Sequence, residues 1–179
     1  MTKDGKKVMD EHDISRALKR IAHEIVEDNK GVHDLVFVGI VARGVPIAQR
    51  LAKIIQHMEG SKDKIPVGGI DISLYRDDLA TKGKYIKVRK SSIPFAIDGE
   101  TVILVDDVLF HGRTIRAALD GLKDYGRSGR VRLAVLVDRG HRELPIQPDY
   151  VGIKVPTTKK EDISVKLLEV DGIDEVQIG

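Results

Sequence analysis

Short apolar runs alternate with longer amphipathic segments along this chain, and that alternation restricts the folds it can adopt. Apolar residues at i, i+3, i+4 and i+7 predict a helix over 13–29, with Asp13 as its N-cap. The run Leu35–Ile40 predicts a strand, and a second helical pattern follows it with Pro46 in the first turn. Further strands are predicted over 67–74, 101–106, 131–137 and 163–170, and a further helix over 112–125. This order predicts an α/β fold, with a mostly parallel, twisted sheet flanked by helices.

Two segments fit neither pattern. Tyr75 to Ser92 is polar and rich in Lys and Asp, which predicts a long exposed loop, and loops of that length in compact domains often carry function. Asp138 to Pro156 contains three prolines and shows little periodicity. The chain has 179 residues, about the length of one domain, so we expect a single domain over 1–179.

Composition excludes several classes of protein. The chain has no cysteine, so it has neither a disulfide framework nor a thiolate zinc site nor a cysteine nucleophile, and a cytoplasmic location is expected. Its apolar runs are much shorter than the roughly 18 residues that span a bilayer, so no membrane segment is expected. The 30 basic and 28 acidic residues give a net charge of +2, which is too small to indicate nucleic-acid binding by the whole surface. Any basic binding surface must be local.

The segment Val102 to Thr114 carries the clearest chemical pattern. Four apolar residues predict a buried strand, Asp106 and Asp107 follow at its carboxyl end, and a glycine-containing turn leads into a helix. Backbone N–H groups at such a turn, with the helix dipole, form an anion site to which Thr114 can add a hydroxyl. The two carboxylates suit sugar hydroxyls, or a Mg²⁺ that the sugar also holds. The segment therefore predicts a site for a phosphorylated ribose.

Gly39 to Gly44 has the glycine spacing of a nucleotide-binding P-loop. Val45 and Pro46 stand where such a loop requires Lys and Ser or Thr, so a P-loop is excluded. Arg43 has a fork of donors that can pair two phosphate oxygens, although an ordinary surface arginine is the plainer interpretation.

The 102–114 pattern resembles the phosphoribosyl pyrophosphate signature of the type I phosphoribosyltransferases. Among these, the chain resembles the PyrR family of pyrimidine-operon attenuators and uracil phosphoribosyltransferases over about 8–170. The segments that carry this likeness are Arg16–Glu24, Leu74–Asp78 and Ala134–Ile146, the last with the run VDRGHRELP. The resemblance implies the type I phosphoribosyltransferase fold with a small hood, formed mainly by 138–170 together with the N-terminal segment.

The resemblance also implies roles for residues of the predicted site. Asp106, Asp107 and Arg43 would be the catalytic residues. The two aspartates would bind Mg²⁺ indirectly, through the substrate, and the loop of Arg43 would hold pyrophosphate. Backbone N–H groups of 111–114 would bind the 5′-phosphate.

A hood and a lid are implied around this site. Arg139, Tyr150 and Val151 would cover the base, although a core role is the alternative for Tyr150, and 75–92 would close as a lid that carries Arg76. The residues expected to bind substrate are Val102, Ile103, Leu104, Val105, Val108, Leu109, Phe110, His111, Gly112, Arg113, Thr114, Gly44, Arg76, Arg139, Tyr150 and Val151.

Phe110 bears on the choice of base. Purine-using relatives generally carry a carboxylate at this place, and because Phe cannot replace it, uracil is expected rather than hypoxanthine. The implied reaction converts uracil and phosphoribosyl pyrophosphate into UMP and pyrophosphate. The alternative is an RNA-binding attenuator whose weakly catalytic site only senses nucleotides.

A basic stripe on the first predicted helix is the candidate RNA-binding feature. Its side chains recur at i, i+3, i+4 and i+7 opposite the apolar face, and a solvated charged face that includes Glu27 is the competing interpretation. The residues expected to contact a pyrimidine-operon leader RNA are Arg16, Lys19, Arg20, His23, His141 and Arg142.

The chain departs from the family pattern at several positions. His111 stands where the family usually has Thr, and Val41-Ala42 stand where a Lys-Thr pair is common. Gln147 and Ile153 stand where relatives often carry basic residues. The loop should still bind phosphate, because most of its contacts come from backbone N–H groups. The loss of the basic side chains lowers the affinity expected for RNA. The chain is also expected to form a homodimer or larger homo-oligomer.

Overall fold

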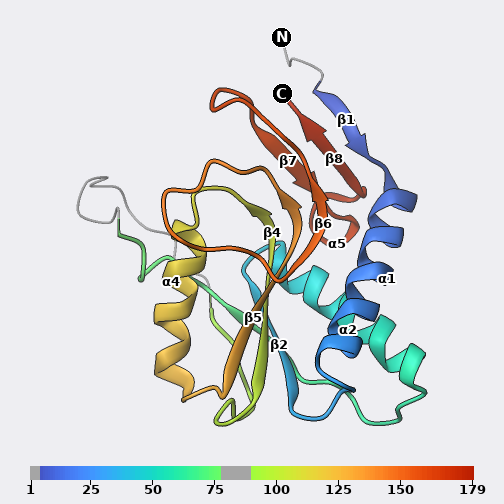
Figure 1. Ribbon diagram of the computed structural model, residues 1–179, viewed down its shortest axis with the longest axis vertical. Helices are drawn as coiled ribbons and strands as arrows, with labels where there is room; N and C mark the ends of the chain where they lie inside the picture. The colour runs from blue at the N-terminus through green and yellow to red at the C-terminus, as the bar shows by residue number, and fades with distance from the viewer. Residues whose placement is uncertain (1–4, 78–89) are drawn as a thin grey trace.

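A parallel sheet forms the centre of the molecule, in a computed structural model that describes residues 5–77 and 90–179. Within these residues the sheet has five strands in the order β3-β2-β4-β5-β6. The strands are β2 (Leu35–Ile40), β3 (Val67–Ile70), β4 (Thr101–Leu109), β5 (Arg130–Asp138) and β6 (Tyr150–Lys154). The chain runs from β2 outwards to β3 and then returns to β4 on the other side of β2 (Figure 1). Strand order therefore reverses between β2 and β4, where open α/β sheets bind their ligands.

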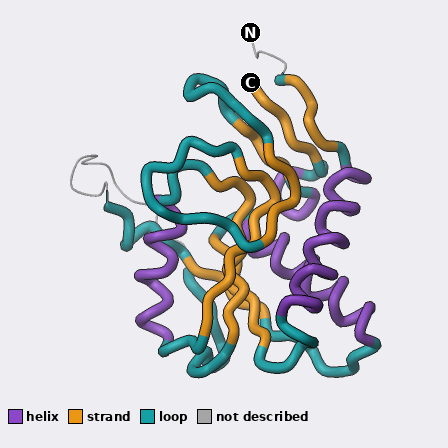
Figure 2. Tube along the Cα trace, viewed as in Figure 1, coloured by secondary structure: helices purple, strands orange, loops and turns teal. Residues whose placement is uncertain are grey.

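Helices cover both faces of this sheet (Figure 2). α1 (Glu11–Asp28) and α2 (Gly44–Glu59) lie on one face, and α4 (Arg113–Leu122), extended by a 3-10 turn, lies on the other. Successive residues of β4 enter different cores: Ile103 packs with α1 and α2, whereas Leu104 packs with α4. Burial on both faces explains why the stretch Val102 to Val105 of this strand is an unbroken apolar run. The predicted α/β fold is confirmed.

A second, antiparallel sheet lies beyond the carboxyl ends of the main strands (Figure 1). It has the order β1 (Lys6–Met9), β8 (Glu175–Ile178), β7 (Ile163–Lys166), and the short helix α5 (Leu168–Asp171) joins β7 to β8. We call β1, β7, α5 and β8 the hood. It differs from the predicted hood, because it continues past residue 170 and because β6 belongs to the main sheet.

Asp10, rather than Asp13, caps the first helix. The Oδ1 of Asp10 accepts a hydrogen bond from the backbone N of Asp13 at 2.9 Å, and the Oδ2 of Asp13 accepts one from the backbone N of Asp10 at 3.1 Å. This capping box satisfies N–H groups that a helix start otherwise leaves open. Both residues are good caps by type, so composition alone did not separate them.

Several predicted boundaries are also wrong. β3 ends at Ile70, because the chain turns just afterwards and the backbone N of Tyr75 bonds to the carbonyl of Ile72. β4 continues to Leu109, so the paired carboxylates lie inside the strand and not after it. The last predicted strand divides into β7 and α5. Residues 78–89 of the predicted lid lie outside the described residues, and none of the described helices is long and apolar enough to cross a membrane.

Candidate functional site

The loop after β2 folds against the end of β4. A Cβ on Gly44 would collide with the carbonyl oxygen of Val105, and a Cβ on Gly39 would lie 2.5 Å from the backbone of Gly44. Glycine at both positions therefore permits a backbone approach that a larger residue would prevent. The peptide between Val41 and Ala42 in this loop is cis. The approach brings Arg43 to the carboxyl end of β4.

The carboxylate pair lies at this junction. Asp106 is 6% exposed and Asp107 is partly exposed. The Oδ1 of Asp106 accepts a hydrogen bond from the backbone N of Asp107 at 2.9 Å, and the Oδ1 of Asp107 accepts one from the backbone N of Val108 at 2.8 Å. Burial, with the adjacent Asp107 carboxylate, raises the pKa of Asp106 well above its usual value. The pair therefore consists of one desolvated carboxyl group, that of Asp106, and one that solvent reaches, that of Asp107.

The turn after β4 presents backbone donors. Gly112 is the N-cap of α4 at φ 94°, a left-handed conformation that suits glycine, and it supplies no side-chain cap for the helix. The first N–H groups of a helix have no partner within it and carry the positive end of the dipole. The carbonyl of His111 accepts hydrogen bonds from the backbone N atoms of Glu143 (3.0 Å) and Leu144 (3.2 Å). These two hydrogen bonds hold the turn in place through its carbonyl oxygen. They do not involve its backbone N–H groups, which therefore suit an anion.

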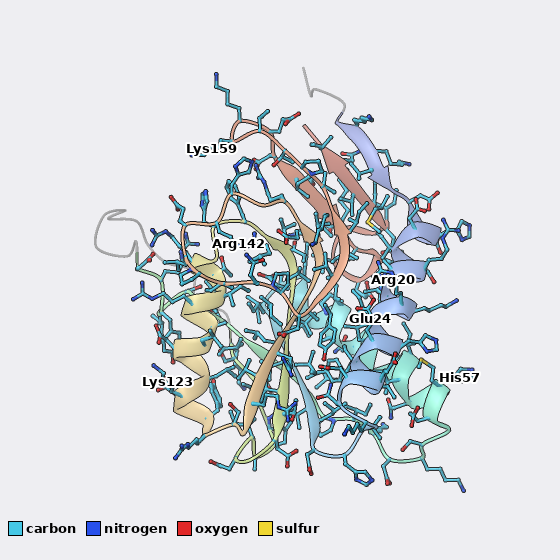
Figure 3. All side chains as sticks on the ribbon, in the orientation of Figure 1. Arg20, Glu24, His57, Lys123, Arg142 and Lys159 are labelled. Carbon is cyan, nitrogen blue, oxygen red and sulfur yellow. The ribbon has the colours of Figure 1, made fainter. Side chains whose placement is uncertain are left out.

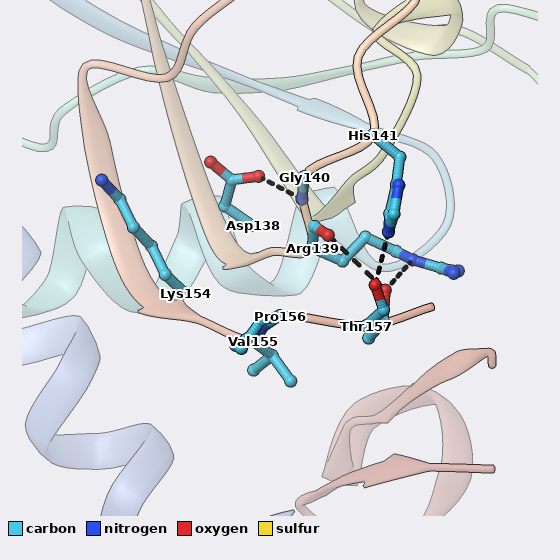
Figure 4. A pocket seen from close by; sticks show the side chains of 8 residues that line it. All are labelled: Asp138, Arg139, Gly140, His141, Lys154, Val155, Pro156 and Thr157. Carbon is cyan, nitrogen blue, oxygen red and sulfur yellow. Dashed lines mark hydrogen bonds between the residues drawn. The ribbon is translucent and has the colours of Figure 1, made fainter. Parts of the chain in front are cut away.

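A pocket of about 380 Å³ opens beside this turn, between the segments that follow β5 and β6 (Figure 4). Arg139 crosses it: its guanidinium bonds to Thr157 and Asp162 and lies 3.8 Å from the ring centroid of Phe110. His141 contacts the carbonyl of Thr157 and meets Phe110 edge-on. The pocket is lined by Asp138, Arg139, Gly140, His141, Lys154, Val155, Pro156 and Thr157.

Comparison with known proteins identifies the family. The phosphoribosyl transferase domain model matches residues 4–169. The bifunctional protein PyrR of Chloroflexus aurantiacus is 57% identical over 173 residues, covering 97% of this chain and 94% of that protein. The chain belongs to the PyrR family. The PyrR protein of Pelotomaculum thermopropionicum is 53% identical over 178 residues, covering 99% of this chain and 97% of that protein.

Solved structures of phosphoribosyltransferases share the fold of this PyrR family member. The hypoxanthine phosphoribosyltransferase of Trypanosoma cruzi has a TM-score of 0.73 at 17% identity, covering 97% of this chain and 95% of that one. A hypoxanthine-guanine phosphoribosyltransferase of Bacillus anthracis has a TM-score of 0.68 at 22% identity, covering 88% and 86%. At such identities the likeness concerns the fold alone.

The structure brings the central predicted residues of this PyrR site together. Arg43 and Gly44 come from the loop after β2, and Asp106, Asp107 and 110–114 come from β4 and the turn that follows it. Arg113 in that turn also bonds to Asp77 at 2.6 Å, which ties the described start of the predicted lid, including exposed Arg76, to the site. Other predicted substrate residues are buried in the strand, and their side chains position the site from beneath: Val102, Ile103, Leu104, Val105 and Leu109.

Tyr150 and Val151 are not among the residues that line the pocket of Figure 4. Tyr150 pairs with Ala134 in the middle of β5, four residues before the carboxyl end at Asp138. Its hydroxyl donates to Asp28 on α1 at 2.7 Å, and burial raises its pKa, with the hydrogen bond to Asp28 adding to the effect. Tyr150 is therefore a core residue that anchors β6 to α1. The family resemblance implied that Tyr150 covers the base, and the core role was the alternative.

The predicted RNA-binding residues fall into two separate groups. Arg20 lies on α1 and Arg142 lies in the connection from β5 to β6, well apart in Figure 3. The Arg142 side chain is only 14% exposed; it pairs with Asp138 at 2.8 Å and donates to the carbonyls of Phe110 and Ile146. His141 lines the pocket. Arg142 is therefore turned inwards, whereas Arg16, Lys19, Arg20 and His23 are exposed on α1. Contact of these residues with RNA stays a prediction.

The sequence missed two parts of the site. Lys154 to Thr157 lines the pocket, and Asp171 of the hood holds Arg43 by a paired hydrogen bond. Lys154–Thr157 could have been found from the strand that precedes it, had β6 been recognised. Asp171 gave no local signal, because its partner lies 128 residues away in the chain.

Proposed function

We propose that the chain transfers a phosphoribosyl group to uracil, forming UMP and pyrophosphate from uracil and phosphoribosyl pyrophosphate. The observation that carries this proposal is the convergence of Asp106 and Asp107, the open N-terminus of α4 and the Arg43 loop at the strand-order reversal. These parts suit a ribose carrying a phosphate on one side and a pyrophosphate on the other. Membership of the PyrR family supports the same reaction.

Each part of the site has a defined task in this reaction. The N1–C1 bond forms as the bond from C1 to pyrophosphate breaks, the N1 proton of uracil passes to solvent or to the departing pyrophosphate, and the ribose gains positive charge in between. Asp106 and Asp107 bind the ribose hydroxyls and stabilise this charge, while amides of 111–114 hold the 5′-phosphate. Arg43 meets the negative charge that develops on pyrophosphate. Holding the reactants in one geometry supplies much of the acceleration.

Mg²⁺ fits the donors that this site offers. In the described residues, no group of three or more acidic or histidine side chains forms a complete metal site. Two neighbouring carboxylates supply hard oxygen ligands, and Mg²⁺ commonly takes its other ligands from water and substrate oxygens. When bound, the ion would neutralise the pyrophosphate. Asp106 and Asp107 would therefore hold it together with the substrate and not alone.

The pocket beside Phe110 is the proposed seat of the base. Arg139, whose guanidinium is stacked on the Phe110 ring, lines one wall, and Val155 with Pro156 contributes apolar surface. Phe110 offers no proton acceptor for a purine ring, which favours uracil. Arg139 is already bonded to Thr157 and Asp162, so its role is to support this wall rather than to donate to a carbonyl of the base.

A substrate screen tests the proposal. Purified chain is mixed with Mg²⁺, phosphoribosyl pyrophosphate and each free nucleobase in turn, and pyrophosphate release is measured. We expect turnover with uracil that depends on Mg²⁺ and that falls by at least about 100-fold in the Asp106→Asn, Asp107→Asn double variant. Turnover with hypoxanthine alone, or full activity in the double variant, contradicts the proposal.

RNA binding is a second proposed activity, and the exposed basic stripe of α1 favours it. Arg16 and Arg20 each have an acidic partner, Asp13 at 2.5 Å and Glu24 at 3.2 Å, so part of their charge is already neutralised. We propose weak binding of pyrimidine-operon leader RNA by a homo-oligomer in the cytoplasm. The alternative, an attenuator whose nucleotide site is nearly inactive, predicts UMP binding without turnover in the same screen.

A further inference from the structure

Two arginines of the α2 region are held by carboxylates of the hood. The Nε and Nη2 of Arg43 donate to both oxygens of Asp171, at 3.1 and 2.8 Å. About two helical turns further on, Arg50 donates to both oxygens of Glu169 and of Asp174, at 2.6 to 2.8 Å. These pairs join segments that are 119 to 128 residues apart in the chain. They therefore fix the hood against the loop that follows β2.

Asp171 is itself rigidly placed. Its Oδ2 also accepts a hydrogen bond from the backbone N of Leu167 at 2.9 Å, which closes the single turn of α5. The Asp171 side chain is 20% exposed, so solvent only partly competes for it. The Arg50 pairs hold the same turn from its other side. Asp171 is consequently a fixed acceptor, and Arg43 is the longer, more flexible partner.

Arg43 keeps donors that this ion pair does not use. Asp171 takes the side of the fork formed by Nε and Nη2, and Nη1 has no part in the pair. Hydrogen bonds to Asp171 raise the pKa of Arg43, with a further contribution from the nearby charge of Asp107 in the ribose site. The guanidinium is thus hydrogen-bonded to a hood carboxylate and lies within the electrostatic reach of Asp107.

We propose that Asp171 is a positioning residue, which orients the guanidinium of Arg43 so that its remaining N–H groups meet the pyrophosphate of the substrate. The proposal rests on the proposed function of the site. Arginine loses rotamer freedom when it binds an anion, and a partner that holds it in place beforehand removes that cost. Asp171 would therefore act on binding of phosphoribosyl pyrophosphate and of pyrophosphate, with little effect on uracil.

The test compares Asp171→Asn with Asp174→Asn. Both remove one carboxylate charge from the hood and keep an oxygen for the backbone bond, but Asp174 pairs with Arg50 and not with Arg43. For Asp171→Asn we expect the KM for phosphoribosyl pyrophosphate and the inhibition constant of product pyrophosphate to rise about 3- to 10-fold, the range for ordering one long side chain. The KM for uracil should change less than twofold. Asp174→Asn should leave all three constants near wild type, and Asp171→Glu should recover part of the loss.

Other results overturn the proposal. Tighter inhibition by pyrophosphate in Asp171→Asn would mean that Asp171 competes with the ligand for Arg43. Equal changes in both variants, accompanied by equal falls in melting temperature, would mean that Asp171 only stabilises the hood. An active wild type with unaltered Asp171→Asn constants removes this inference alone, whereas an inactive wild type removes the proposed function.

Discussion

Asp106 is nearly enclosed by protein and touches a second acidic residue, so its ionised form is less favourable in the folded chain than in water. A neutral residue of the same shape would avoid that cost. The proposed reaction accounts for the carboxylate where the fold does not, because a cationic ribose would gain from a desolvated negative charge. Active sites commonly combine local instability with function in this way.

Asp106→Asn should stabilise the protein and inactivate it. The pKa of Asp106 is raised in the folded state, so the folded chain binds more protons, and stability falls as pH rises from 3.8 through the folded pKa. The variant should match wild type in acid and melt at a higher temperature at pH 8, with turnover reduced about 100-fold. Thermal unfolding across this range measures the effect, with Asp120→Asn, at a half-exposed carboxylate, as control. A variant that melts below wild type at pH 8 contradicts the assigned burial cost.

Individual residues differ in how far the sequence could reveal them. Asp106, Asp107 and Gly112 were identifiable because strand, carboxylates and turn follow one another in a short segment. Arg142 was misassigned as a surface residue, because a charged residue in a polar, proline-containing loop is usually solvated. Its burial depends on Asp138 and on carbonyls of two other turns, which meet only in the folded chain.

At the scale of elements, the connection from β5 to β6 braces the phosphate turn. Arg142 joins Asp138 at the end of β5 to the carbonyl of Phe110, and the backbone of Glu143 bonds to His111. The turn that would hold phosphate is therefore supported by a segment that also lines the base pocket. This connection contains no helix, so periodicity gave no means of predicting its course.

Arg142→Met should damage both stability and activity. It leaves the Asp138 carboxylate largely buried without its partner, which typically costs about 3 to 5 kcal/mol of the free energy of unfolding. The KM values for both substrates should rise because the phosphate turn and the base pocket lose a shared support. Chemical denaturation and steady-state kinetics measure these effects. Adding Asp138→Asn should recover part of the stability, and Arg16→Met on the exposed face of α1 should alter neither quantity.

Edge and terminal strands were the elements that the sequence predicted least well. The central strands β2, β4 and β5 have buried, nearly continuous apolar residues and were recognised. β6 is an edge strand with partly exposed residues, and β1 pairs with β8 across almost the whole chain. Their short patterns carry little local information, because their stability comes from partners that are remote in sequence.

At the scale of the whole molecule, the hood depends on carboxylates that must stay charged. Hydrogen bonds to Arg43, Arg50 and Lys7 lower the pKa values of Asp171, Glu169 and Glu175, respectively. Each of these carboxyl groups has a lower pKa in the folded chain than its usual value of 3.8 (Asp) or 4.5 (Glu), so its charge stabilises the folded hood above that pH. This stabilisation is lost as pH falls through the lowered pKa values.

Acid should therefore release the hood before it unfolds the main sheet. As pH falls below about 4, amide hydrogen exchange in β8 should accelerate while β4 stays protected, since the apolar core around β4 does not depend on these charges. Exchange measured at pH 3 and pH 6 tests this expectation. Lys7→Met should shift the release of β8 to higher pH, and simultaneous loss of protection in both strands would show that hood and sheet unfold as one unit.

The distribution of charge over the whole molecule predicts RNA binding that is weaker than family membership alone would suggest. Val41, Gln147 and Ile153 remove candidate contacts, and the structure turns Arg142 inwards. Three exposed cations, Arg16, Lys19 and Arg20, remain on α1, and at about 0.7 to 0.9 counterions for each phosphate contact they give a salt slope of at most roughly −2 to −3 per chain. Phosphate contacts position a protein without reading sequence, so little preference is expected between a pyrimidine-operon leader hairpin and a scrambled hairpin.

Titration of both hairpins at two salt concentrations, with and without UMP, measures this preference and the salt slope, and Lys19→Gln should flatten the slope by about one unit. Tight, UMP-enhanced preference for the leader would contradict the prediction and would require a reading surface beyond α1.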